Sequence, residues 1–267
     1  MSLEVGGSQS SGPTSDITSG PTNGPANGGE PGGRLSGVRA LCFDIFGTVV
    51  DWRSSIIREG QLLQQRLALP AQDWPAFADA WRAGYQPAMH EVRTGVLPWT
   101  HIDGLHRRIL DRLLAARGLT LREDDAANFN RVWHRLIPWP DSVAGLYRLK
   151  QRFLITSLSN GNVALLVNMA KHAGLPWDTV LSAELFNHYK PDPEVYLGAA
   201  RLLGLQPAQV MMVAAHPSDL RAAAACGLRT VYVPRPLEHG PDGPMEPFTA
   251  GEFDLVAPDF SALAALL

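Results

Sequence analysis

The second half of the chain alternates short apolar runs with helical segments, and this alternation constrains the fold more than any other feature. Segments of strand length, rich in β-branched and other apolar residues, stand at 153–158, 180–183, 210–215 and 230–233. Helix-like segments, among them 193–203 and 218–226, lie between them. Strands that alternate with helices build a parallel sheet with helices on both faces. The sequence therefore predicts an α/β fold with a doubly wound, mostly parallel, Rossmann-like sheet.

One apolar run, Val38–Phe43, stands apart from the others and ends at Asp44. No strand pattern follows it until after residue 138, and the intervening segment has the periodicity of amphipathic helices. The helices that we expect there are Ser54–Leu67, Trp74–Val92, His101–Arg117 and Glu123–Leu136. We therefore expect an all-helical cap over 52–138, inserted into a core domain of residues 37–51 and 139–267. A cleft between the cap and the carboxyl edge of the sheet is the expected site.

Composition excludes several classes of partner. Residues 1–36 are rich in Gly, Ser, Thr, Pro and Asn and predict a disordered tail without a targeting signal. The formal net charge of −3 over 267 residues gives no basic surface for nucleic acid, and no run is apolar enough to span a membrane. Cys42 and Cys226 lie far apart and outside any metal-ligand spacing. We expect a soluble, cytoplasmic protein with reduced thiols.

Polar side chains follow the expected carboxyl ends of the strands. They are Asp44 with Thr48, Ser159 with Asn160, Lys190, and His216 with Asp219. Each has an ordinary explanation when taken alone, since Asn160-Gly161 is a common turn and Asp219 is suited to cap the helix that follows it. Because the carboxyl ends of parallel strands meet at one edge of a sheet, we expect these side chains to form one site.

These residues resemble the motifs of the haloacid dehalogenase superfamily and, within it, the L-2-haloacid dehalogenases. The resemblance covers about residues 39–267, including the cap. It rests on Asp44-Ile45-Phe46-Gly47-Thr48, Leu158-Ser159-Asn160-Gly161-Asn162, Tyr189-Lys190-Pro191-Asp192 with Tyr196, and Ala214-Ala215-His216-Pro217-Ser218-Asp219. Phosphatases of the superfamily hold Mg²⁺, which prefers oxygen ligands, through carboxylates that this chain replaces by Phe46 and by Ala215-His216. The resemblance therefore implies a hydrolase that needs no metal and no cofactor. It also implies a homodimer, since caps of this family often support dimers.

The resemblance implies a role for each residue of the site. Asp44 would attack the carbon that bears the halogen and form an aspartyl ester, which water then opens. Lys190 would meet the substrate carboxylate or keep Asp44 ionised, Thr48 would bond to Asp44, and Asp219 would orient or deprotonate the water. The residues that we expect to bind substrate or halide, or to support those that do, are Phe46, Arg82, Trp99, Ser159, Asn160 and Tyr196.

The chain departs from the best-known pattern of this family at Ala214 and His216, where that pattern has serine and asparagine. His216 has several roles open to it: to position the hydrolytic water, to share its proton, to donate to a halide, or only to bond a neighbouring loop. A related branch of the family with Ala-Ala-His here includes enzymes that act on small haloacetates. Chloroacetate and fluoroacetate therefore join 2-chloropropionate as candidate substrates, and fluoride is the harder leaving group because it needs stronger donors.

Two alternatives stay open on the sequence alone. One is a magnesium-dependent phosphatase or phosphonatase of the same fold, which the missing carboxylates oppose. The other is a non-catalytic protein that binds small acids, and the presence of Asp44, Lys190 and Asp219 together opposes it. The cap also contains four tryptophans that either form its core or mark an oligomer surface, namely Trp74, Trp81, Trp99 and Trp133.

Overall fold

A computed structural model of the chain describes residues 37–267, and the tail expected over 1–36 lies outside the described residues. The described chain forms one six-stranded sheet, in which every neighbouring pair of strands is parallel. Its strands are β1 (Ala40–Phe43), β4 (Leu154–Ser159), β5 (Thr179–Ser182), β6 (Val210–Ala214), β7 (Arg229–Tyr232) and β8 (Leu255–Val256). The spatial order is β5-β4-β1-β6-β7-β8, so the direction of strand addition reverses at β1. Such a switch point opens a crevice at the carboxyl end of the central strand, where Asp44 stands.

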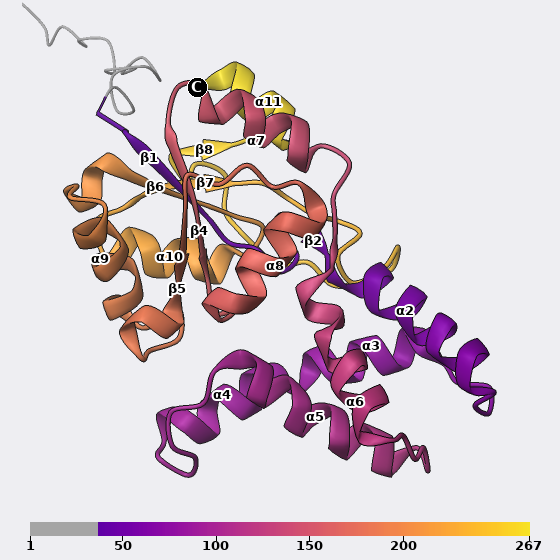
Figure 1. The fold of residues 1–267 in the computed structure, drawn as a ribbon. Helices are drawn as coiled ribbons and strands as arrows, with labels where there is room; N and C mark the ends of the chain where they lie inside the picture. Colours follow the sequence, from indigo (N-terminus) through magenta and orange to yellow (C-terminus); the bar gives the residue numbers. More distant parts are fainter. Residues whose placement is uncertain (1–36) are drawn as a thin grey trace, which may run out of the picture.

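Helices cover both faces of this sheet (Figure 1). Leu41 and Phe43 share a hydrophobic cluster with α7 (Ser142–Lys150), α8 (Val163–Ala173) and α11 (Phe260–Leu266). Cys42, between them in sequence, belongs to a second cluster with α9 (Pro193–Leu202) and α10 (Pro217–Ala225). Successive residues of β1 therefore face opposite layers, as the two-residue period of a strand requires. The predicted doubly wound α/β fold is confirmed.

A layer of helices stands between β1 and β4 in the sequence. It comprises α2 (Trp52–Leu67), α3 (Trp74–Ala83), α4 (Tyr85–Arg93), α5 (Ile102–Ala116), α6 (Glu123–Asn130) and the 3₁₀ helix η1 (Arg131–His134). The chain leaves and re-enters the core through an antiparallel pair, β2 (Val50–Asp51) and β3 (Ile137–Pro138). Asp51 caps α2, since its carboxylate accepts from the Ser54 amide at 2.9 Å. In Figure 1, α3 to α6 lie below the sheet, on the side to which β1 delivers the chain.

Two expected helices are divided in the structure. The helix expected over 74–92 breaks at Gly84 into α3 and α4. Pro87 explains the break, because it has no N–H to bond back to Ala83 and its ring crowds the preceding turn. The helix expected over 123–136 ends at Asn130 and continues as η1. Not predicted were β2, β3, β8, α7, α11 and the 3₁₀ helices η2 (Ala183–Phe186) and η3 (Pro207–Gln209).

Aromatic side chains form the core of the helical layer. Trp74, Trp81 and Trp133 are at most 2% exposed, with Trp81 and Trp133 edge to face at a centroid distance of 5.6 Å. Trp99 is half-buried and stacks on Tyr189 at 4.7 Å. The three buried tryptophans thus give no argument for an oligomer surface. Within residues 37–267, the structure has no helix of the length and hydropathy that crossing a membrane requires.

Candidate active site

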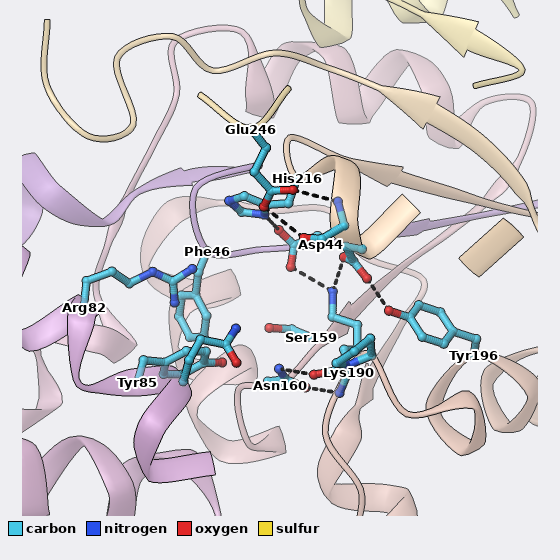
Figure 2. Close-up of a pocket in the computed structure, with 14 residues that line it drawn as sticks. Asp44, Phe46, Arg82, Tyr85, Ser159, Asn160, Lys190, Tyr196, His216 and Glu246 are labelled. Atoms are coloured by element: carbon cyan, nitrogen blue, oxygen red, sulfur yellow. Dashed lines mark hydrogen bonds and ion pairs between the residues drawn. The ribbon is translucent and has the colours of Figure 1, made fainter. Parts of the chain in front are cut away.

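Loops from the carboxyl edge of the sheet and residues of the helical layer surround a cavity of about 290 Å³ (Figure 2). Asp44 follows β1, Ser159 ends β4, Lys190 precedes α9 and His216 precedes α10. The predicted site residues that line the cavity are Asp44, Phe46, Arg82, Ser159, Asn160, Lys190, Tyr196, His216 and Asp219. The sheet edge and the helical layer thus meet at one cavity.

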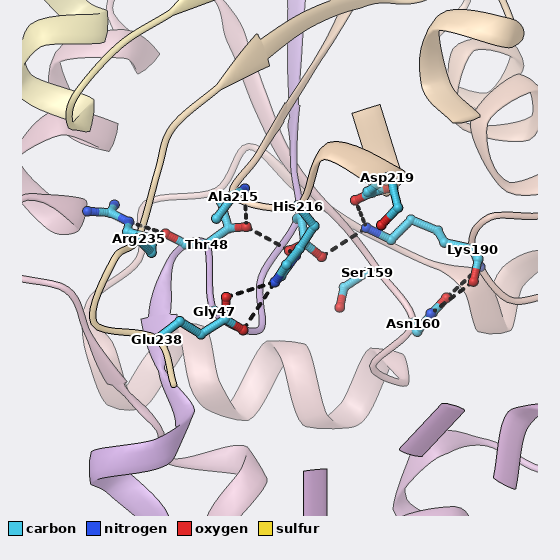
Figure 3. A network of polar contacts seen from close by, with 12 residues as sticks. Gly47, Thr48, Ser159, Asn160, Lys190, Ala215, His216, Asp219, Arg235 and Glu238 are labelled. Carbon is cyan, nitrogen blue, oxygen red and sulfur yellow. Dashed lines mark hydrogen bonds and ion pairs between the residues drawn. The ribbon is translucent and has the colours of Figure 1, made fainter. Parts of the chain in front are cut away.

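Five ionisable side chains form a row in which the sign of the charge alternates (Figure 3). Lys190 Nζ donates to Asp44 Oδ1 at 2.9 Å and to Asp219 Oδ2 at 2.5 Å. His216 Nδ1 lies 3.1 Å from Asp44 Oδ2, and His216 Nε2 lies 2.9 Å from Glu238 Oε2. We call Asp219, Lys190, Asp44, His216 and Glu238, in this order, the charge row. All but His216 are less than a tenth exposed, so each charge depends on its neighbours for the stabilisation that water would otherwise give.

Neutral donors complete the hydrogen bonding at both ends of the charge row. The Tyr196 hydroxyl donates to Asp219 Oδ1 at 2.5 Å. At the other end, Trp52 Nε1 donates to Glu238 Oε1 at 3.0 Å. Because Trp52 is the first residue of α2, the row is bonded to the beginning of the helical layer.

Thr48 fixes the orientation of the Asp44 carboxylate. Its hydroxyl donates to Asp44 Oδ2 at 2.7 Å and accepts from the Ala215 amide at 2.9 Å. Together with His216, it occupies Oδ2, whereas Oδ1 accepts only from Lys190 among the described residues. Oδ1 therefore accepts one hydrogen bond and has a free lone pair, whereas Oδ2 already accepts two.

The neighbours of Asp44 keep it ionised. Burial alone would raise the pKa of Asp44, but the Lys190 ammonium, His216 and the Thr48 hydroxyl together outweigh it and hold that pKa well below its usual range. His216 shows the opposite balance, since burial would lower its pKa but Glu238 and Asp44 raise it to about 10. At neutral pH, His216 is therefore an imidazolium that donates from both ring nitrogens.

Asp219 is the member of the charge row most ready to take up a proton. Burial raises the pKa of Asp219 above its ordinary value, although Lys190 and Tyr196 counteract that rise. Burial would also raise the pKa of Glu238, but the His216 imidazolium outweighs it and the pKa of Glu238 is lowered. Each end carboxylate shares its cation with Asp44, but their other neighbours differ. The charge of Asp44 adds to the rise in the pKa of Asp219, whereas Arg82 adds to the lowering of the pKa of Glu238.

Arg82 of α3 reaches the cavity from the helical layer (Figure 2). Its guanidinium carbon lies 4.7 Å from the Tyr85 ring centroid and 5.8 Å from that of Trp52. Arg82 Nη1 is buried and has no hydrogen-bond partner within residues 37–267. A buried guanidinium nitrogen without an acceptor is suited to bind an anion. Phe46, 6.4 Å from Tyr85 between ring centroids, adds an apolar wall beside it.

Asn160 and Ser159 organise the opposite wall. Asn160 Oδ1 accepts from the Lys190 amide at 2.6 Å, and its Nδ2 donates to the Lys190 carbonyl at 3.3 Å. This pair of bonds fixes the backbone that carries the Lys190 ammonium. Ser159 lines the cavity, and its Oγ accepts from the Gly161 amide at 3.2 Å. Its hydroxyl donates to no acceptor within residues 37–267, so it is available to a bound molecule.

Trp99 does not line the cavity, since it stacks on Tyr189 outside it. Conversely, the sequence analysis did not single out Glu238, Tyr85 or Glu246, although the first belongs to the charge row and the others line the cavity. Glu238 lies in a loop that has no motif and no periodic pattern. The one signal available for it was its place in the segment that follows a strand.

Within residues 37–267, no group of three or more His, Cys, Asp or Glu side chains has the arrangement of a metal site. The oxygens of Asp44 are instead bonded by Lys190, His216 and Thr48. A cation that bound this carboxylate would have to displace those donors and approach two positive charges.

The haloacid dehalogenase-like hydrolase family matches residues 38–227, and the chain belongs to this family. Two solved structures similar to it are the L-2-haloacid dehalogenase PA0810 and the defluorinating L-2-haloacid dehalogenase Rha0230. The first is 49% identical, with a TM-score of 0.83, over 86% of this chain and 98% of that one. The second is 45% identical, also with a TM-score of 0.83, over 86% and 95% of the two chains. Among curated proteins, (S)-2-haloacid dehalogenase 1 of Pseudomonas sp. (strain CBS-3) is 29% identical over 74% of this chain and 85% of its own length. The protein is an enzyme that acts on carbon–halide bonds.

Proposed function

We propose that this protein hydrolyses short 2-haloalkanoic acids, without a metal ion, through an ester formed on Asp44. Chloroacetate, 2-chloropropionate and fluoroacetate are the proposed substrates. One observation carries the proposal: a cavity of about 290 Å³ is lined both by a buried, ionised Asp44 and by Arg82, whose buried Nη1 has no acceptor within residues 37–267. A nucleophile and an anion site at one small cavity are what displacement of a halide requires.

In the first step, a lone pair of Asp44 Oδ1 forms a bond to the carbon that bears the halogen. The carbon–halogen bond breaks, and its electron pair leaves with the halide. Oδ1 is the attacking oxygen because Thr48 and His216 already bond to Oδ2. The attack occurs opposite the leaving group, so a chiral substrate is inverted at C2. Arg82 Nη1 receives the halide as negative charge develops on it.

In the second step, water attacks the ester carbonyl carbon of Asp44. His216 is already protonated at neutral pH and does not act as the base. Asp219 takes the proton from water, since it is the carboxylate of the row whose pKa is raised. The bond between the carbonyl carbon and Oδ1 then breaks, and Asp219 returns its proton to Oδ1, which leaves as the hydroxyl oxygen of the product. The second proton of the water is lost to solvent as the Asp44 carboxyl group ionises again. The oxygen of water remains in Asp44.

Two features favour a small, anionic substrate. Ser159, which lines the cavity, is the proposed donor to the substrate carboxylate. Phe46 and Tyr85 form an apolar wall that limits the group carried at C2. Release of fluoride is proposed because a relative of 45% identity is described as defluorinating and because Arg82 leaves a buried donor open.

The test is halide release from chloroacetate, fluoroacetate and each enantiomer of 2-chloropropionate, in the presence of EDTA, by the wild-type protein and Asp44→Asn. Asp79→Asn serves as the matched control, because Asp79 is an exposed carboxylate that pairs with Arg53 away from the cavity. We expect release that ignores EDTA, disappears in Asp44→Asn and persists in Asp79→Asn. Activity that EDTA abolished and Mg²⁺ restored would instead support a phosphatase-like enzyme.

Isotope labelling tests the ester itself. During a single turnover in ¹⁸O-labelled water, we expect heavy oxygen in the peptide that contains Asp44 and ordinary oxygen in the product. Label that appeared only in the product of the first turnover would mean that water attacks the substrate directly.

A further inference from the structure

Glu238 is a buried carboxylate that is bonded to a residue of the candidate active site. It lies between β7 and β8 in the chain and is 5% exposed. Its Oε2 lies 2.9 Å from His216 Nε2, and its Oε1 accepts from Trp52 Nε1 at 3.0 Å. Both carboxylate oxygens thus have partners. His216, the partner of Oε2, is also in direct contact with Asp44.

The nucleophile loop makes room for this carboxylate. Gly47 has φ +87°, and a Cβ built on it would lie 2.1 Å from Glu238 Oε1. No residue with a side chain fits there without displacing Glu238. Gly47 therefore does more than allow a turn. Its lack of a side chain lets the Glu238 carboxylate lie against the backbone of the loop that follows Asp44.

A second contact ties the loop of Glu238 to the loop of Asp44. Arg235 Nε donates to the Thr48 carbonyl at 2.9 Å, and its guanidinium pairs with Asp141 at 2.7 Å. Arg235 is well buried, its side chain being 7% exposed. The backbone before Glu238 is therefore fixed to the loop that carries Asp44 and Thr48.

We propose, on the basis of the function proposed above, that Glu238 is a positioning residue that keeps His216 doubly protonated and directed at Asp44 Oδ2. In this arrangement, His216 stabilises the negative charge that forms on Oδ2 when water attacks the ester. Thr48 is the other donor to the same oxygen. Oδ2 is the oxygen that stays on Asp44 as the ester carbonyl, so its donors in the free enzyme become the donors to the oxyanion.

The ester step makes Glu238 necessary. In the free enzyme two carboxylates contact His216, namely Asp44 and Glu238. Once Asp44 is an ester it carries no charge, so Glu238 is the contacting carboxylate that remains to hold His216 as a cation. The charged or titratable groups near this pair are Asp44, Lys190, Asp219, Arg82, His239 and Glu246. Arg82 is a cation and opposes protonation of His216, which increases the dependence on Glu238.

The first measurement is the protonation of His216 in the wild-type protein, by NMR of ¹⁵N-labelled histidine, with the signal assigned from its loss in His216→Asn. We expect both ring nitrogens to carry protons at pH 7 and the titration midpoint to lie well above the ordinary histidine value of about 6.5. A wild-type His216 that titrates near that value would overturn the proposal, whatever the variants do.

The second measurement uses Glu238→Gln, which keeps the shape and the acceptor for Trp52 but removes the charge. We expect the His216 midpoint to fall by about 1 to 3 pH units, the usual effect of losing one close opposite charge. We also expect kcat to decline towards alkaline pH as His216 deprotonates, with KM little changed. Ester hydrolysis should slow more than ester formation, so intact-protein mass spectra should show accumulated adduct after substrate is added.

Glu252→Gln is the matched control, because Glu252 lies in the same segment between β7 and β8 but is exposed and pairs with Arg221. This variant should leave the His216 midpoint and the pH profile as in the wild type. A Glu238→Gln protein that is folded and keeps the wild-type midpoint would show that Glu238 has only a structural role. Wild-type protein that releases no halide would refute the proposed function, while the NMR titrations would still decide whether Glu238 controls His216.

Discussion

Replacing Lys190 by methionine tests whether the charge row is held together by alternating charge. Lys190 Nζ lies 2.9 Å from Asp44 Oδ1 and 2.5 Å from Asp219 Oδ2, and all three side chains are at most 10% exposed. Methionine fills much of the volume but leaves two carboxylates without the cation between them. Removing one partner of a buried ion pair costs about 3 to 5 kcal/mol of unfolding free energy. His216 still contacts Asp44, so we expect Asp219 to relieve the strain by taking up a proton.

The uptake of that proton makes the cost depend on pH. Burial already raises the pKa of Asp219, and the loss of the Lys190 ammonium removes the main influence that lowers it. A carboxyl group whose pKa is higher in the folded than in the unfolded state stabilises the fold when protonated, and this stabilisation is lost as pH rises through the folded pKa. The difference in unfolding free energy from the wild type should therefore grow with pH by about 1.4 kcal/mol per unit. A full cost of about 3 to 5 kcal/mol spans about two to four pH units at that slope.

Urea unfolding of the wild type and Lys190→Met between pH 4 and pH 8 measures this slope. Lys150→Met is the matched control, because Lys150 pairs with Asp178 at 2.8 Å with both side chains about a third exposed. Its cost should stay below about 1 kcal/mol, and because the pKa of Asp178 is lowered by that pair, the cost should not grow from pH 5 upward. A Lys190→Met protein whose destabilisation is the same at every pH would refute the reasoning.

Three further substitutions test other parts of the site and the cap. Asp219→Asn should allow ester formation but block its hydrolysis, and a folded, substrate-binding variant that showed no adduct by mass spectrometry would contradict this role. Arg82→Met should lower kcat by about 10²-fold, with a larger loss for fluoroacetate than for chloroacetate, and equal losses in halide-release assays would argue against Arg82 as the halide donor. Within residues 37–267, neither ring nitrogen of His106 has a hydrogen-bond partner, and burial lowers the pKa of His106 to about 3. Since unfolded His106 gains a proton below about pH 6.5 and the folded one does not, stability should fall as pH drops from there to 3. His106→Phe should abolish that loss and raise the unfolding free energy by about 1 kcal/mol, and acid unfolding as steep as in the wild type would contradict this.

The fold could be predicted from the sequence because its signals are local and repeated. Strands that alternate with helices after residue 153, with a strandless block before them, define a parallel sheet and a helical layer without knowledge of any tertiary contact. The signals failed where an element is too short to show a period, as in the two-residue strands β2 and β3. They failed again at Gly84, where the effect of Pro87 divides an otherwise continuous amphipathic pattern.

The candidate site was predictable to the extent that its residues stand at strand ends. Asp44, Lys190 and Asp219 follow from position and motif, and the structure brings them within hydrogen-bond distance. Glu238 did not follow, because its contact with His216 is made by a loop without a regular pattern, fixed by tertiary contacts such as that of Arg235 with Thr48. Sequence could place Trp99 in the cap but could not show that its ring turns towards Tyr189.

The charge row also explains why the proposed chemistry needs a residue from the helical layer. Three carboxylates and two cations alternate in the row, so each of its positive charges already faces two negative ones. Ester formation removes the charge of Asp44 and places a new one on the halide, on the other side of the substrate carbon. Lys190 and His216 stay bonded to the carboxylates that remain, so neither is free to follow that charge. Arg82 lies on α3, and its Nη1 has no acceptor within residues 37–267. In the proposed reaction, the displaced charge therefore moves from the sheet towards the helical layer. That reaction requires the two to be held together, as they are where Arg93 of α4 donates to the Lys190 carbonyl at 2.8 Å.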